Sequence, residues 1–173
     1  MIYLARHGQT DWNLFRRANG VTDTFLNITG LEQAKQLAEE LKDVSFDACF
    51  CSPLTRARQF CEILYKGQIV FDERLVEIIC GEFESMEETP EMMKSAFQAS
   101  QTGDKGTERM DIFIKRNCDF CNLIAETYKG KNVLIVTHAY NTRAINYFFK
   151  GMPKEYNFFE RVVENGKVIT LEN

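Results

Sequence analysis

Short apolar runs with strand-like residues alternate with helical patterns along this chain, and this alternation limits the fold more than any other feature. The runs cover residues 2–5, 47–51, 69–71 and 133–136. The last, Val-Leu-Ile-Val, is apolar at every position, as expected for a strand buried on both faces of a parallel sheet. The pattern predicts an α/β fold, a three-layer α/β/α sandwich with a mostly parallel central sheet.

Helix signals lie between these runs. Thr29 followed by Glu32 predicts a capping box at the start of one helix. Ser52, followed by a proline, predicts the start of a second helix. Two further helices are expected in the second half of the chain, over about 107–128 and 139–149.

An Asn-Gly pair at positions 165–166 separates the strand-like runs 159–163 and 167–171. This dipeptide is typical of a tight hairpin turn. We expect the hairpin to add an antiparallel edge strand to the sheet. An edge strand also permits pairing with a second copy, so a homodimer stays open.

Length and composition are consistent with one domain over residues 1–173, with a short covering segment at about 83–110. A hydrophobic fraction of 45% excludes a disordered chain.

The net charge of −4 makes a nucleic-acid partner unexpected. No apolar stretch approaches a membrane span and no N-terminal signal is visible, so we expect a cytoplasmic protein without a membrane partner.

The chain has six cysteines. Cys49 and Cys51 lie two apart in a strand-like run, which predicts one shared sheet face. Cys118 and Cys121 form a lone CxxC within a helical pattern. We interpret the cysteines as small buried hydrophobes in a reducing compartment, with structural zinc or thiol redox chemistry as the alternative.

Both histidines of the chain follow predicted strands. His7 stands in Arg6-His7-Gly8 after the first run, and His138 follows the last, while Arg56 falls in the helix that begins after the second run. Parallel sheets bind ligands beyond the carboxyl ends of their strands. Arginine matches phosphate oxygens, helix N-termini attract anions, and a neutral imidazole is a nucleophile, so the set indicates a phosphoryl group.

Two other classes of function stay open from the residues alone. A metal-dependent hydrolase would use both histidines with carboxylates, but neither histidine has ligand spacing, so we expect no metal. The second class is a non-catalytic phosphate-binding or regulatory module.

The segment Arg6-His7-Gly8-Gln9-Thr10-Asp11-Trp12-Asn13 resembles the signature of the histidine phosphatase superfamily, in its phosphoglycerate mutase-like branch. The resemblance continues, in the family's order, through residues 52–59, 74–78 and 136–138. It therefore covers most of the chain.

The resemblance implies a phosphoglycerate mutase-like fold and a set of catalytic roles. His7 would become phosphohistidine, and Glu77 would protonate the leaving oxygen and then activate water. The groups implied to hold the phosphoryl group are Arg6, Arg56, His138 and, assisting them, Asn13. No metal or other cofactor is needed, because guanidinium and imidazolium groups carry the positive charge.

The chain departs from the family where Gly-Gly commonly follows the second histidine. Here the residues are Ala139 and Tyr140. We expect Ala139 to offer its N–H to the substrate, and Tyr140 to narrow the pocket or contact the substrate. The stretch 72–91 holds eight acidic residues, which favours a small phosphorylated metabolite of modest charge.

The implied chemistry suits both hydrolysis and phosphoryl transfer between hydroxyls. The covering segment is short, which favours entry of water. We therefore predict a metal-independent phosphomonoester hydrolase of the histidine acid type, with cofactor-dependent phosphoglycerate mutase-type transfer as the alternative.

Overall fold

The computed structural model describes residues 1–152 and 162–172. At its centre is a five-stranded sheet in the order β3-β2-β4-β1-β5. The strands are β1 (Ile2–Arg6), β2 (Ala48–Cys51), β3 (Ile69–Phe71), β4 (Val133–Thr137) and β5 (Val168–Leu171). The first four run parallel and β5 is antiparallel to β1. The predicted α/β fold with an antiparallel edge strand is confirmed.

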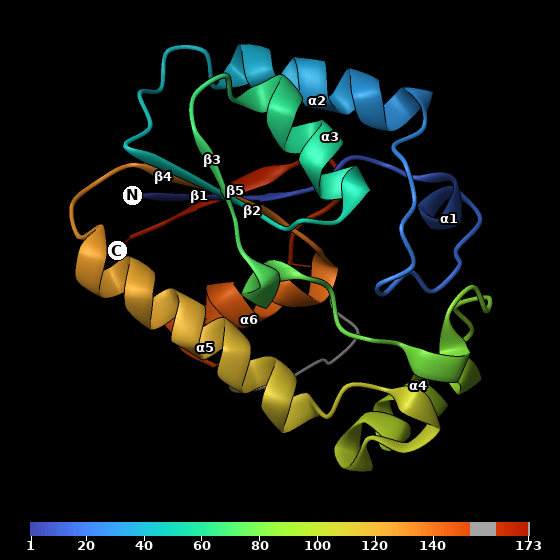
Figure 1. Cartoon of the computed structure of the whole chain (residues 1–173). Helices are drawn as coiled ribbons and strands as arrows, with labels where there is room; N and C mark the ends of the chain where they lie inside the picture. Colours follow the sequence, from blue (N-terminus) through green and yellow to red (C-terminus); the bar gives the residue numbers. More distant parts are fainter. Residues whose placement is uncertain (153–161, 173) are drawn as a thin grey trace.

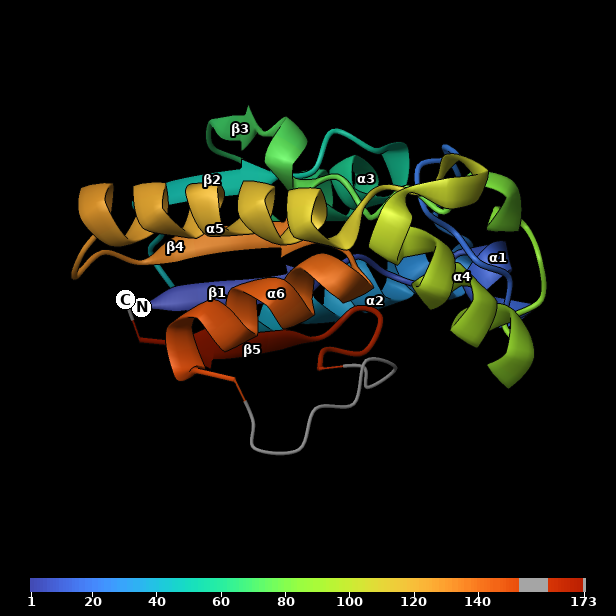
Figure 2. The same ribbon diagram turned by 90° about the horizontal axis from the view of Figure 1, so that it is seen from below.

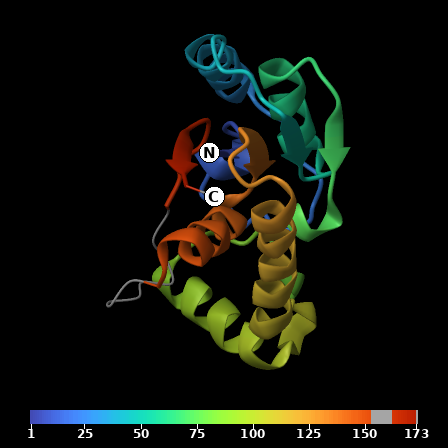
Figure 3. The ribbon, with the colours of Figure 1, turned by 90° about the vertical axis from the view of Figure 1, so that its left-hand side faces the viewer.

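Helices cover both faces of the sheet (Figures 1 and 3). One face carries α2 (Ile28–Glu40) and α3 (Thr55–Leu64), and the other carries α5 (Met110–Thr127) and α6 (Ala139–Lys150). Residues 133–136 of β4 alternate between the two cores, which is why all four are apolar. The three predicted layers follow from this double burial.

The remaining helices gather at one end of the sheet. Figure 2 shows α4 (Pro90–Thr102) and α1 (Asp11–Leu14) beyond the carboxyl ends of the parallel strands, with the N-terminus at the opposite end. Short 3-10 turns are η1 (Glu73–Leu75), η2 (Gly81–Phe83) and η3 (Asp104–Gly106). The part of the chain expected to cover a site therefore lies where parallel sheets bind ligands.

The helix α2 begins earlier than the capping box predicted. Asn27 is its N-cap, and the Asn27 side chain accepts a hydrogen bond from the Gly30 N–H at 3.0 Å. Thr29 lies inside the first turn, so the predicted cap was wrong. Asparagine is as good a cap as threonine, and tertiary contacts decide between neighbouring candidates.

The helix after β2 begins at Thr55, with Leu54 in the N-cap position. The prediction that Ser52 caps it was wrong, because the Ser52 hydroxyl lies 2.7 Å from Nε2 of His138. The long helix α5 likewise begins at Met110, later than the predicted start near 107.

The predicted C-terminal hairpin is described only in part. The Asn165–Gly166 turn is present, and β5 after it pairs with β1 as the antiparallel edge strand. Residues 162 and 163 form a bend. The rest of that run lies outside the described residues.

All six cysteines are free thiols; four are buried, whereas Cys80 and Cys118 are partly exposed. Cys49 and Cys51 share the face covered by α2 and α3, as predicted, and pack there with Cys61 as free thiols. Within residues 1–152 and 162–172, no group of three or more His, Cys, Asp and Glu side chains is arranged to hold a metal ion. No described helix is long and apolar enough to cross a membrane.

Candidate active site

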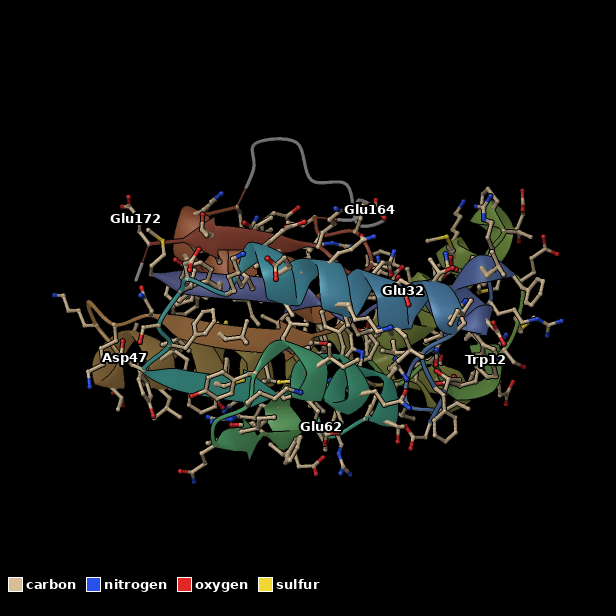
Figure 4. The ribbon with its side chains drawn as sticks, turned by 90° about the horizontal axis from the view of Figure 1, so that it is seen from above. Trp12, Glu32, Asp47, Glu62, Glu164 and Glu172 are labelled. Atoms are coloured by element: carbon tan, nitrogen blue, oxygen red, sulfur yellow. The ribbon has the colours of Figure 1, made fainter. Side chains whose placement is uncertain are left out.

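The carboxyl ends of β1, β2 and β4 stop within one residue of one another in register. His7, Ser52 and His138, which follow these strands, therefore emerge side by side, and the two imidazole rings have centroids 5.0 Å apart. Figure 4 shows Trp12, soon after His7, at this end of the molecule and Asp47, which precedes β2, at the other. The structure brings both histidines together, as the strand-end pattern predicted.

The hydrogen bonds of His7 define which ring nitrogen is available for chemistry. Nδ1 lies 2.7 Å from the Gly8 carbonyl oxygen, which only accepts, so Nδ1 carries the proton and Nε2 has the lone pair. The Arg56 Nε–H donates to Nε2 at 3.3 Å. Burial, with the charges of Arg56 and Arg6, lowers the pKa of His7 well below 6.5. His7 is thus held as a neutral imidazole.

His138 is completely buried, and one of its nitrogens is satisfied. Nε2 lies 2.7 Å from the Ser52 hydroxyl, whereas Nδ1 has no hydrogen-bond partner among the described residues. Burial and then the charge of Arg56 lower the pKa of His138 well below 6.5. A buried polar atom without a partner costs about 1–3 kcal/mol, so a ligand atom that bonds to Nδ1 would remove a real penalty.

Arg56 is fully buried at the start of α3 and is fixed by backbone carbonyls. Its Nη1 donates to the Thr22 carbonyl at 3.1 Å and its Nη2 to the Gly20 carbonyl at 2.6 Å. These bonds hold the guanidinium with its Nε–H directed at His7. The arrangement places a permanent positive charge beside the nucleophilic nitrogen.

Glu77 lies on the segment after η1 and is 5% exposed. Its Oε1 accepts from the Ile78 N–H at 2.9 Å and its Oε2 from the Tyr140 N–H at 3.3 Å. Burial raises the pKa of Glu77 above 4.5, although the two N–H donors and Arg56 act in the opposite direction. Burial therefore favours the protonated carboxyl, the form that a general acid needs.

The backbone of Glu77 is held from the side by Arg116 of α5. The Arg116 guanidinium donates to the carbonyls of Val76 at 2.6 Å and Glu77 at 3.3 Å. It also forms a two-pronged ion pair with Glu108 at 2.7 and 2.8 Å, with both side chains mostly buried. This network orients the segment that presents the Glu77 carboxyl.

Most of the predicted site residues line a single cavity. They are Arg6, His7, Asn13, Glu77, Ala139 and Tyr140. The other two, Arg56 and His138, lie against His7 behind this surface. Part of the wall is apolar and comes from η2 and α4, through Phe83, Met92, Met93 and Ala96.

Two residues near the site were missed from the sequence. Asn165 donates through Nδ2 to the His7 carbonyl at 3.1 Å and to Oδ1 of Asn13 at 3.2 Å. Its only signal was the Asn-Gly turn. Arg143 of α6 is buried in the cavity wall, with its guanidinium carbon 4.9 Å from the centre of the Tyr140 ring. Nothing in the helix pattern singled out Arg143.

A family model of the histidine phosphatase superfamily (branch 1) matches residues 2–172. The chain belongs to this superfamily. The resemblance seen in the Arg-His-Gly segment is thereby confirmed over nearly the whole chain.

Relatives of this superfamily member include named phosphatases. The uncharacterized phosphatase PhoE of Bacillus subtilis is 34% identical over 79% of this chain and 70% of its own length. The metal-independent phosphoserine phosphatase of Arabidopsis thaliana is 35% identical over 83% of this chain and 66% of its own length. The probable phosphoglycerate mutase GpmB of Proteus mirabilis is 37% identical, but over 50% of this chain and 41% of that protein.

Solved structures show the same fold. The α-ribazole phosphatase of Shigella flexneri superposes with a TM-score of 0.81 at 28% identity, covering 96% of this chain and 87% of that one. YhfR of Bacillus stearothermophilus gives 0.80 at 27% identity, with 96% and 88% covered. Family and relatives together support a phosphatase enzyme.

Proposed function

We propose that this protein is a metal-independent phosphomonoesterase that acts on a small phosphorylated metabolite through a phosphohistidine at His7. The observation that carries the proposal is the Nε2 lone pair of His7, held beside the Arg56 guanidinium at the edge of the cavity that contains Glu77. Nucleophile, positive charge and proton donor are the groups that phosphoryl transfer requires.

In the first step, Nε2 of His7 attacks phosphorus and the bond from phosphorus to the ester oxygen breaks. The Glu77 carboxyl gives its proton to that oxygen, so the product leaves as a neutral alcohol. We assign the phosphoryl oxygens to Arg6, the Asn13 amide and the Ala139 N–H at the cavity, and to Arg56 and Nδ1 of His138 directly behind them. These groups would stabilise the negative charge that develops in the transition state.

In the second step, the Glu77 carboxylate removes a proton from water as the water oxygen attacks phosphorus. The bond from phosphorus to Nε2 breaks, which returns the lone pair to His7 and releases inorganic phosphate. Glu77 is left protonated for the next cycle. The raised pKa suits a carboxyl that must act first as an acid and then as a base.

The walls of the cavity support an organic leaving group of modest charge. Phe83, Met92 and Met93 supply apolar surface, and Glu88 adds an acid at the same cavity. We place the segment at about 83–110 in the role of a cover that contacts the leaving group. The named activities of the Shigella and Arabidopsis relatives, on α-ribazole phosphate and phosphoserine, agree with small organic phosphomonoesters.

The test is His7→Ala in a phosphatase assay with 4-nitrophenyl phosphate, run with and without EDTA. We expect the parent protein to turn over in EDTA and to yield an acid-labile phosphoenzyme when quenched during turnover. The variant should do neither while keeping its melting temperature. Full activity of His7→Ala would disprove the histidine mechanism. Conversion of 3-phosphoglycerate to its 2-isomer without free phosphate would identify a mutase instead.

A further inference from the structure

Tyr140 lines three separate cavities. The first is the cavity of His7 and Glu77. The second is a groove between α5 and α6, and the third is a small hollow beneath α4. The residue therefore stands between the catalytic cavity and two spaces that the proposed reaction does not use.

The position of Tyr140 is fixed at both backbone and ring. Its N–H donates to Oε2 of Glu77 at 3.3 Å, in the first turn of α6. Its ring packs against the Arg143 guanidinium, with 4.9 Å from ring centre to guanidinium carbon. A cation over an aromatic face contributes about 0.5–2 kcal/mol. The ring thus forms a firm wall.

The groove beside Tyr140 is mostly apolar, although Arg143 lines both this groove and the catalytic cavity. Its walls come from Phe113, Ile114, Ala144, Phe148 and Met152, together with Met110. An aromatic or branched hydrocarbon group matches this lining, because apolar surface gains most from an apolar contact. The charged and catalytic side chains of Arg6, His7, Glu77 and Glu88 line the catalytic cavity and not this groove.

We propose that Tyr140 is the specificity-determining residue that limits the size of the leaving group, by closing the catalytic cavity off from the groove between α5 and α6. This inference rests on the proposed phosphatase function. With the ring present, the site takes small leaving groups, up to a single ring. Without it, the two spaces join and an extended apolar leaving group fits along α6.

Position 144 on α6 offers a matched control for Tyr140. Ala144, one turn further along α6, lines only the groove among these cavities. A larger residue at position 144 would refill the groove from behind without entering the catalytic cavity.

The experiment compares kcat/KM for 2-naphthyl phosphate and phenyl phosphate, two aryl esters that differ in size. We expect Tyr140→Ala to raise the naphthyl-to-phenyl ratio about tenfold, the usual scale for a changed apolar contact. Tyr140→Phe keeps the ring and should keep the ratio. The double change Tyr140→Ala with Ala144→Phe should return the ratio toward that of the parent. A merely structural role would lower both rates together and leave the ratio unchanged, which would overturn the proposal.

Calorimetric binding of phenylphosphonate and 2-naphthylphosphonate separates this inference from the proposed reaction. Neither compound is hydrolysed, so the ratio of their Kd values tests the proposed role of Tyr140 even in a protein without turnover. Relatively tighter binding of the naphthyl compound by Tyr140→Ala supports the proposal, and an unchanged Kd ratio in a folded variant refutes it. If Tyr140→Ala does not fold, Tyr140→Leu gives the same comparison with a smaller opening. Absence of turnover in the parent protein would instead count against the phosphatase mechanism alone.

Discussion

Replacing Glu77 with glutamine tests the proton donor with little change in shape. The amide introduced by Glu77→Gln can still accept from the Ile78 N–H at the 2.9 Å position, but its NH₂ then faces the Tyr140 N–H, a donor against a donor. One hydrogen bond is lost, worth about 1 kcal/mol of the free energy of unfolding. The variant should therefore fold and keep the phosphate-binding groups in place.

The catalytic effect depends on the leaving group. A positioned general acid contributes about 10²–10⁴-fold when the departing oxygen needs a proton. We expect a loss of that size in kcat for an alkyl ester such as phosphoserine. The loss for 4-nitrophenyl phosphate should be much smaller, because nitrophenolate leaves without a proton. The assay is phosphate release from both esters by parent and variant.

The pH dependence provides a second readout of the same group. The acid must be protonated for the first step, and burial raises the pKa of Glu77 above 4.5. Hydrolysis of the alkyl ester should therefore fall on the alkaline side as this carboxyl ionises, and Glu77→Gln should remove that limb. Equal losses for both esters, with an unchanged pH profile, would refute the role of Glu77 as proton donor.

Other changes test the supporting structure. Arg56→Lys removes the guanidinium group that contacts loop carbonyls and Nε2 of His7. We expect kcat to fall about 10²–10³-fold. The control variant is Arg58→Ala, on the exposed side of the same helix. The pKa of His138 is lower in the folded protein than its unfolded value of 6.5, so only the unfolded chain gains a proton as the pH falls through 6.5. The melting temperature of the parent protein should therefore drop over this range, and that of His138→Gln should drop less. Gly30→Ala would place a Cβ 2.2 Å from the Gln9 carbonyl oxygen and should cost about 1–3 kcal/mol in urea unfolding.

Several site residues were predictable because strand ends carry their own signal. His7 and His138 each follow an apolar run, and Arg56 lies in the first turn of a helix that follows another, so the topology of a parallel sheet brings them together. Glu77 was different, since it is one of eight acids in the stretch 72–91 and only the family resemblance singled it out. Its burial is what distinguishes it from the other acids, and burial depends on packing.

Local patterns failed where distant partners competed with them. Ser52 has the residue type and place of a helix cap, but its hydroxyl bonds to Nε2 of His138, 86 residues away in the chain. The turn at Asn165 looked like the tip of a hairpin, yet its amide contacts the backbone of the segment that carries His7. A hydrogen bond between residues far apart in the chain produces no periodic pattern in the sequence, so the sequence alone could not predict it.

By itself, the sequence determined the class of fold and the chemical type of the site, because hydrophobic period and strand order decide which residues follow each strand. Only the tertiary structure decided the states of those residues. The proton on Nδ1 of His7 depends on the Gly8 carbonyl, and the raised pKa of Glu77 depends on its burial. The tertiary structure also decided that Tyr140 lines both the catalytic cavity and the groove between α5 and α6. These properties come from solvent exclusion and contact geometry, which exist only once the chain is folded.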